Sequence, residues 1–306
     1  MNFPPFLQPG DTIGICAPAR KVSREETADG IALLRSKGFQ VIEAPNLYGA
    51  YHQFSGTDHE RRQDFQFLLD HPEVKAIISA RGGYGCVRIV DGLDWEKFRQ
   101  HPKWIIGFSD LTVIHNALRN LQIPGIHGPM LFNLHADKIY APAADHLFEI
   151  LGGTLRPFLV KGNLKVHALN RTGNAEGVLI GGNLSILYSQ AGSASDIDTK
   201  NCILFLEDLD EFLYHIDRMM IQLLRSGKLA GLKGLIVGGM SDMKDNAVPF
   251  GESAEQIIRR VCEPFDFPIW FGFPAGHISE NHPLVLGSNV RMSVSDSLLL
   301  EYVRPA

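Results

Sequence analysis

Three residues of this chain have the side chains that acyl transfer needs, and each follows an apolar segment. Ser109 and Glu207 come directly after apolar runs, and His277 follows a third run after a short Pro-Ala-Gly turn. A serine hydroxyl is a weak nucleophile until an imidazole removes its proton, and that imidazole needs a carboxylate to fix its tautomer. The three side chains therefore suffice for a serine hydrolase if the fold brings them together.

Ser109 lies where a strand pattern changes directly into a helical one. Bulky apolar residues at 104–106 precede Gly107 and Phe108, and a helical apolar spacing begins at Leu111. A serine in such a turn presents its hydroxyl outwards, and the N-terminus of the following helix offers free backbone N–H groups to a developing negative charge. The alternative is a helix N-cap, which serine also fills well, and this segment taken alone favours the cap.

The segments at Glu207 and His277 shift the interpretation towards a nucleophile. Open α/β sheets bind and react at the carboxyl ends of their strands, so all three residues are expected at one sheet edge. Asp208 is a rival for the acid, but it points to the opposite face if the strand continues through Glu207. His282 is a rival for the base, but its place at the start of the next strand favours a structural role.

Five short motifs follow one another along the chain, and they are Arg81-Gly82-Gly83-Tyr84-Gly85, Gly107-Phe108-Ser109-Asp110, Leu206-Glu207-Asp208, Tyr214-His215-Ile216-Asp217-Arg218-Met219 and Pro274-Ala275-Gly276-His277. Together they resemble the LD-carboxypeptidase family, the muramoyltetrapeptide carboxypeptidase group of serine peptidases. The resemblance extends from Pro9 to about Gly287, nearly the whole chain. It implies a Ser-Glu-His triad formed by Ser109, Glu207 and His277.

The resemblance also implies how the site would be completed. The oxyanion hole would consist of backbone N–H groups, one from Asp110 and one from Gly82 or Gly83. The substrate would be a muropeptide that loses its C-terminal D-alanine during peptidoglycan recycling, and the enzyme would be a homodimer. A carboxypeptidase must recognise a terminal carboxylate, and a guanidinium can do so with two parallel hydrogen bonds. Arg81 is the candidate for this role, although an ordinary surface position is the more common fate of an arginine.

The glycine-rich segment that begins at Arg81 has a competing interpretation as a dinucleotide-binding loop. Gly83 and Gly85 fit the first two glycines of that fingerprint, but Arg88 stands where a third glycine or alanine is needed for close helix packing. We therefore expect no nucleotide cofactor. No H-E-x-x-H motif is present, and His115 and His127 are too far apart for one helical turn, so we expect no metal.

Length and composition set wider limits. With 306 residues, 45% of them hydrophobic, the chain is long for one core and predicts two domains. A net charge of −5 gives no electrostatic reason to expect a nucleic-acid partner. The four cysteines are scattered without a C-x-x-C pair, which indicates core thiols in a reducing compartment. The N-terminus lacks a secretion pattern and no apolar run approaches ~20 residues, so we expect a cytoplasmic protein away from the membrane.

The first half of the chain alternates strand and helix patterns. We expect strands at 12–17, 39–42, 76–79 and 104–106, with helices at 25–36, 58–69 and 141–151. This order predicts a parallel sheet with right-handed crossovers, of the flavodoxin-like kind. The expected N-terminal α/β domain spans residues 1–155 and carries the nucleophile.

The second half predicts a smaller mixed α/β domain at residues 174–306, after a linker at 156–173. We expect it to carry Glu207 and His277, to contain a helix at 214–225, and to be completed by terminal segments around Val285–Leu286 and Val290–Met292. The family resemblance adds that this half is a swivelled β/α layer.

The sequence therefore favours a two-domain α/β serine carboxypeptidase. One alternative within the family is a microcin-immunity type of peptidase, which cleaves aminoacyl-nucleotide conjugates. Its distinguishing feature would be an aromatic loop residue stacked on a base, and the sequence does not identify one. An alternative of another class is a nonenzymatic ligand-binding protein that uses the same crevice. Three triad-compatible residues at strand ends argue against that class.

Overall fold

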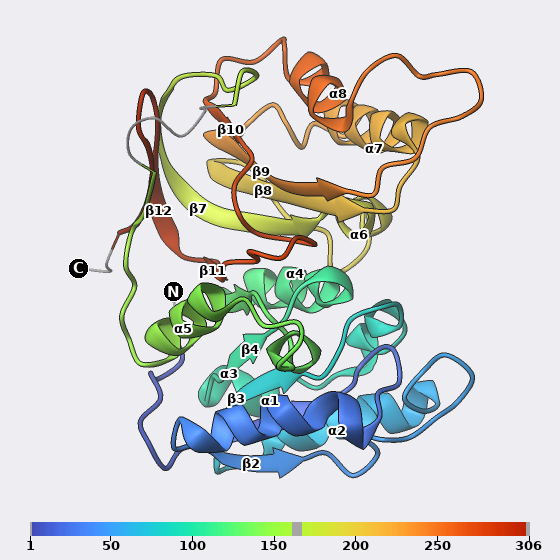
Figure 1. The fold of residues 1–306 in the computed structure, drawn as a ribbon, viewed down its shortest axis with the longest axis vertical. Helices are drawn as coiled ribbons and strands as arrows, with labels where there is room; N and C mark the ends of the chain where they lie inside the picture. The colour runs from blue at the N-terminus through green and yellow to red at the C-terminus, as the bar shows by residue number, and fades with distance from the viewer. Residues whose placement is uncertain (1, 161–166, 304–306) are drawn as a thin grey trace.

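The computed structural model describes residues 2–160 and 167–303, so residues 161–166 of the predicted linker lie outside the described part. The chain forms two sheets, one in each half (Figure 1). The blue-to-green N-terminal half lies below the yellow-to-red C-terminal half in that view, and strand β11 runs between them. This confirms the predicted mixed α/β class with two layers of different topology.

The N-terminal sheet has six strands in the order β11-β5-β4-β3-β1-β2. All its pairings are parallel except that between β5 and β11. Its first five strands in the chain therefore have the flavodoxin-like order 2-1-3-4-5, as predicted. The strands are β1 (Thr12–Cys16), β2 (Gln40–Glu43), β3 (Val74–Ser79), β4 (Trp104–Ile106), β5 (Gly125–His127) and β11 (Leu284–Leu286).

Helix ends in this half follow capping signals in the sequence. Ser23 and Glu26 form a reciprocal capping box, and Thr57 and Glu60 form another, which satisfies backbone groups that the first turn leaves unpaired. The helices are α1 (Arg24–Ser36), α2 (Asp58–Asp70), α3 (Glu96–Gln100), α4 (Thr112–Asn120) and α5 (Ala141–Leu151), with 3₁₀ turns η1 (Cys86–Arg88), η2 (Val90–Gly92), η3 (Ser109–Leu111) and η4 (Leu131–Leu134).

The C-terminal sheet has seven strands in the order β10-β9-β8-β7-β12-β13-β6. Four of them pair in parallel, and the other three add antiparallel on one side. The parallel strands are β7 (Gly173–Asn183), β8 (Cys202–Leu209), β9 (Gly234–Ser241) and β10 (Ile269–Phe271), and the antiparallel ones are β12 (Asn289–Val294), β13 (Leu298–Tyr302) and β6 (Phe158–Val160). Its helices are α6 (Leu184–Ser189), α7 (Leu213–Arg225) and α8 (Ala254–Val261).

Strand β11 corrects one expectation. We expected Val285–Leu286 to complete the C-terminal sheet, but β11 pairs antiparallel with β5 at the edge of the N-terminal sheet. The three residues of β11 are apolar and at most 5% exposed. A short apolar run can be buried in either sheet, so the sequence does not indicate which sheet it joins. Strand β6 likewise lies within the predicted linker and extends the C-terminal sheet.

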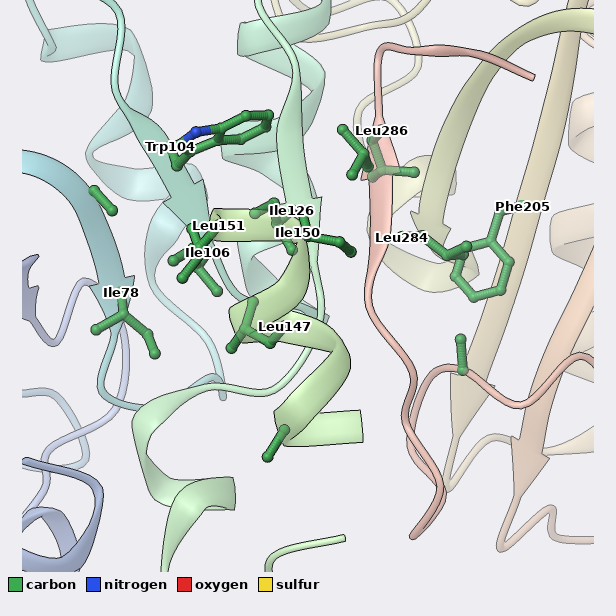
Figure 2. Close-up of a cluster of buried hydrophobic side chains, with 14 of the residues drawn as sticks. Ile78, Trp104, Ile106, Ile126, Leu147, Ile150, Leu151, Phe205, Leu284 and Leu286 are labelled. Atoms are coloured by element: carbon green, nitrogen blue, oxygen red, sulfur yellow. The ribbon is translucent and has the colours of Figure 1, made fainter. Parts of the chain in front are cut away.

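One hydrophobic cluster joins the two halves. Figure 2 shows Leu284 and Leu286 between the N-terminal strands that carry Ile106 and Ile126 and the C-terminal strand that carries Phe205. All five side chains are at most 5% exposed. Because apolar burial is the main stabilising contribution to packing, this shared core fixes the strand ends of one half against those of the other.

Two further features concern the chain as a whole. All four cysteines are buried and none forms a disulfide, which agrees with the expected core thiols. Among the described residues, we find no helix that combines the length and the apolar character needed to cross a membrane.

Candidate active site

Ser109 lies in the tight turn between β4 and α4 and has a left-handed backbone, with φ of 62°. A residue other than glycine rarely adopts this conformation, and such strain is typical of a nucleophile at a strand-to-helix turn. Ser109 is the first residue of η3, Phe108 stands at the N-cap position, and no side-chain hydrogen bond caps that turn. The N-cap alternative for Ser109 is therefore wrong.

His277 and Glu207 form a direct pair. The imidazole Nδ1 lies 2.6 Å from Glu207 Oε2, and the His277 backbone N–H donates to the same oxygen at 3.2 Å. Because an ionised carboxylate only accepts hydrogen bonds, Nδ1 carries the proton and Nε2 is left with a lone pair. Glu207 is completely buried, and the His277 side chain is 16% exposed. The pair has the tautomer that a general base requires.

The turn before His277 is built around a glycine and two polar side chains. Gly276 has φ of 102°, and a Cβ there would lie 2.6 Å from Glu207 Cβ, so only glycine lets the turn approach the acid. The Gly276 N–H donates to Asn281 Oδ1 at 2.8 Å, and Ser241 Oγ donates to the His277 carbonyl at 2.7 Å. These contacts fix the backbone of the loop that carries His277.

Phe108 and Gly82 connect the nucleophile turn to its surroundings. The Phe108 ring lies 4.8 Å from the His277 ring, centroid to centroid, so the residue before Ser109 contacts the imidazole. A Cβ on Gly82 would lie 3.1 Å from Ser109 Cβ and 3.3 Å from Ser109 Oγ. The glycine-rich turn after β3 therefore lies against the Ser109 side chain, whereas a Cβ on Gly83 would meet Arg20 instead, at 2.8 Å.

Asp110 attaches the nucleophile turn to the glycine-rich turn. Its Oδ2 accepts the Cys86 backbone N–H at 2.7 Å, at the start of η1, and the carboxyl group is almost fully buried. Burial raises the pKa of Asp110, an effect that these hydrogen bonds partly oppose. The side chain of Asp110 thus connects the two turns. Its backbone N–H lies in η3, directly after Ser109.

Asp208 faces away from the catalytic pair, as predicted. Its carboxyl group accepts hydrogen bonds from Asn183 Nδ2, from the Ser185 N–H and from the N–H of the next residue, Leu209, each at 2.9 Å. Desolvation raises the pKa of Asp208 to about 7, with a further contribution from Glu207. Asp208 therefore stabilises the start of α6 and leaves the imidazole to Glu207.

The two remaining candidates from the sequence, Arg81 and His282, have contacts of their own with other residues. Arg81 Nη1 donates to Glu26 Oε1 at 2.9 Å, and its guanidinium lies 4.3 Å from the centroid of the Phe132 ring. Its role in carboxylate binding stays a prediction. The His282 ring packs against Tyr140, His146 and Phe158, and burial lowers its pKa. That environment is the structural one expected for His282.

A cavity of about 330 Å³ adjoins the imidazole and lies between the two halves of the chain. Phe108 and His277 form one side, and residues of the segment from η4 to α5 form another. The sequence did not predict that the segment from η4 to α5 lines the site, because the residues of a loop do not show which strand end the loop will approach. Within the described residues, no group of three or more histidines, cysteines and carboxylates is arranged to hold a metal ion.

Comparison with known proteins shows the family to which the chain belongs. The model of the LD-carboxypeptidase N-terminal domain matches residues 13–128, and that of the C-terminal domain matches residues 176–292. A probable murein peptide carboxypeptidase of Bacillus subtilis is 33% identical over 303 residues, covering 97% of this chain and 93% of that protein. The Microcin C7 self-immunity protein MccF of Escherichia coli is 26% identical, covering 94% and 91%.

Solved structures give the same result. The crystal structure of muramoyltetrapeptide carboxypeptidase from Oxalobacter formigenes superposes with a TM-score of 0.84 at 28% identity, covering 96% of this chain and 99% of that one. The chain described here belongs to the LD-carboxypeptidase family. It is a hydrolase of the serine peptidase class, which replaces the nonenzymatic alternative considered from the sequence.

Proposed function

We propose that this protein is a serine carboxypeptidase that releases the C-terminal D-alanine from muramoyl or free tetrapeptides, with Ser109, Glu207 and His277 as its triad. The observation that carries the proposal is the buried Glu207–His277 pair beside the strained Ser109 turn. Murein peptide and muramoyltetrapeptide carboxypeptidases among the relatives support the substrate class. The metal-free acyl-transfer chemistry follows from the residue types.

The proposed reaction has two acyl-transfer steps. Ser109 Oγ attacks the carbonyl carbon before the terminal D-alanine, and His277 Nε2 takes the hydroxyl proton. The tetrahedral intermediate collapses, the C–N bond breaks, and the imidazolium returns the proton to the leaving amine. Water then attacks the acyl-enzyme, again with His277 as base, and restores Ser109. Glu207 stabilises the imidazolium in both steps because its carboxylate is buried and lies 2.6 Å from the ring nitrogen.

Backbone N–H groups would hold the oxyanion. We assign one to Asp110, the residue after the nucleophile, and the other to Gly82. Gly82 is favoured over Gly83 because a Cβ built on Gly82 would lie 3.1 Å from Ser109 Cβ, whereas one built on Gly83 would meet Arg20. Removing one oxyanion donor typically costs about 10² to 10³ in kcat, which makes this contribution comparable to that of the acid.

The biological setting follows from the substrate. A tetrapeptide released from the cell wall is an intermediate of peptidoglycan recycling. We therefore propose that the enzyme acts in that process and in the cytoplasm. We also retain the homodimer as part of the proposal, since it is the assembly that the family resemblance implied.

A panel of substrates tests the proposed function. Free alanine is measured by chiral chromatography after incubation with tetrapeptides that end in D-alanine, L-alanine or a D-alanine carboxamide, and with an aminoacyl-nucleotide conjugate. We expect release of D-alanine from the first peptide, and little from the L-form, because inversion at Cα moves either the methyl group or the carboxylate from its site. Hydrolysis of the conjugate without release of D-alanine would favour the microcin-immunity alternative, for which the similarity to MccF is the argument.

A further inference from the structure

The charge around the cavity beside His277 has one sign. Among the described residues that line it, Lys138 is the one lysine or arginine, and none is an aspartate or a glutamate. Much of the remaining wall is apolar and includes Phe108, Leu134 and Ile139. Lys138 is itself exposed, so its attraction for an anion becomes stronger when a bound substrate covers it and excludes water.

Lys138 is held at this place by an aromatic ring. Its Nζ lies 3.3 Å from the centroid of the Phe132 ring, a cation–π contact. Phe132 belongs to η4, and its backbone N–H donates to the Ala80 carbonyl at 3.0 Å, directly after β3. The ring is therefore fixed to the same strand end that leads into the glycine-rich turn, and it orients the ammonium group without neutralising it.

Arg81 contacts the same ring but is already paired. Its guanidinium donates to Glu26, whose other carboxylate oxygen accepts the Ser23 N–H in the capping box of α1. To bind a substrate carboxylate, Arg81 would have to give up or share an existing ion pair. Among the described carboxylates, none lies within 4.0 Å of Lys138 Nζ, so a substrate carboxylate would meet an unpaired ammonium group.

We propose that Lys138 is a specificity residue whose Nζ binds a free carboxylate of the peptide substrate. This inference rests on the proposed carboxypeptidase function and names the group that selects its substrate. The two C-terminal residues of a tetrapeptide that ends in diaminopimelate-D-alanine offer two free carboxylates: the C-terminus itself and the carboxylate of the diaminopimelate side chain. Both offer the same charge to the cavity, and peptides that lack one or the other distinguish them.

The test measures binding in the absence of turnover. In a Ser109→Ala background, the affinity for the tetrapeptide is measured by calorimetry with and without Lys138→Met, which keeps most of the length of the side chain and removes its charge. A lost charge-assisted hydrogen bond predicts at least about tenfold weaker binding. Lys138→Arg retains most of the affinity because the positive charge remains. Lys233→Met is the matched control. Lys233 is also exposed, but it lies directly before the first residue of β9 and does not line the cavity.

Two modified peptides identify the carboxylate. If Lys138→Met no longer weakens binding when the C-terminus is a carboxamide, Lys138 binds the D-alanine carboxylate. If its effect disappears when lysine replaces diaminopimelate, Lys138 binds the side-chain carboxylate. An equal loss on all peptides, or no loss on any, overturns the inference. Release of D-alanine by the unmodified enzyme is measured in parallel: its absence from every peptide overturns the proposed function and this inference together, whereas its presence confines a failure to Lys138.

Discussion

Glu207 Oε2 accepts two hydrogen bonds from His277, one from the ring and one from the backbone N–H of the same residue. A single oxygen thus fixes both the position of the loop and the orientation of the imidazole. The other oxygen, Oε1, is buried and has no hydrogen-bond partner among the described residues. A buried carboxylate with an unsatisfied oxygen gains most from a nearby positive charge, which forms when His277 accepts a proton.

Replacing the nucleophile gives the first prediction. Ser109→Ala should lower kcat by a factor on the order of 10⁴ to 10⁶, because binding and oxyanion stabilisation remain without covalent catalysis. Steady-state release of D-alanine measures the effect, and a thermal melt checks that the fold is intact. His277→Ala should have a similar effect, and the double variant should be little worse than either single one. Retention of more than about a tenth of the turnover by Ser109→Ala would exclude it from the mechanism.

The second prediction separates the two adjacent carboxylates. Glu207→Gln keeps the shape of the side chain but removes the charge that stabilises the imidazolium, so kcat should fall by roughly 10³ or more. Asp208→Asn should cost much less, because Asp208 contacts Asn183 and the start of α6 instead of the imidazole. The two kcat values are compared under identical conditions. Equal losses, or a larger loss for Asp208→Asn, would show that the acid has been assigned to the wrong residue.

The third prediction uses two glycines with positive φ. Gly276→Ala places a methyl group 2.6 Å from Glu207 Cβ, which must separate the acid from His277, and kcat should fall by on the order of 10² or more. Gly272→Ala is the matched control: its φ is 74°, but a Cβ there meets nothing within 4 Å. Both variants carry backbone strain, so both should lose stability in a denaturant titration. Only Gly276→Ala should lose most of its activity, and equal activities would contradict the close approach.

The fourth prediction concerns pH and stability. Because the pKa of Asp208 is about 7 in the folded protein and 3.8 is its ordinary value, the folded state keeps a proton that the unfolded state releases between these limits. The contribution of Asp208 to stability is therefore fully present below about pH 4 and is lost as the pH rises towards 7. Each pKa unit corresponds to about 1.4 kcal/mol.

The variant Asp208→Asn tests this prediction, because an asparagine side chain does not titrate and the variant therefore lacks the pH-dependent contribution of Asp208. Relative to the unmodified protein, its free energy of unfolding should improve as the pH rises from 4 to 8, by on the order of 1 kcal/mol per pH unit in the middle of that range. Urea titrations at several pH values measure the difference. A difference that stays constant with pH would show that Asp208 is ionised throughout.

Much of this architecture could be predicted from the sequence, because its strongest signals are local. The capping residues Ser23 and Thr57 mark helix starts, and the predicted helix at 141–151 has the bounds observed for α5. Alternating strand and helix patterns are also sufficient for the parallel order of the first sheet. The Glu207–His277 pair was expected from the apolar runs that precede both residues, together with the family resemblance.

What the sequence could not supply depends on contacts between distant segments. Asn281 and Ser241 hold the His277 loop, but a hydrogen bond to a backbone group leaves no pattern in the sequence. Lys138 reaches the cavity only because η4 is attached to the end of β3. The partner of β11 could not be chosen either, since a three-residue apolar run has no preference between two sheets.

The crossing of β11 into the first sheet has a consequence for how the protein is made. Residues 12–127 supply five strands of that sheet, but β5 gains its outer partner only when Leu284–Leu286 leaves the ribosome. Until then the nascent N-terminal half presents an apolar strand edge, the type of surface on which chains associate wrongly. His277 lies just before the strand that closes this edge. Completion of the first sheet and synthesis of His277, the proposed base, are therefore nearly simultaneous and late, and a chain cut near residue 155 lacks both.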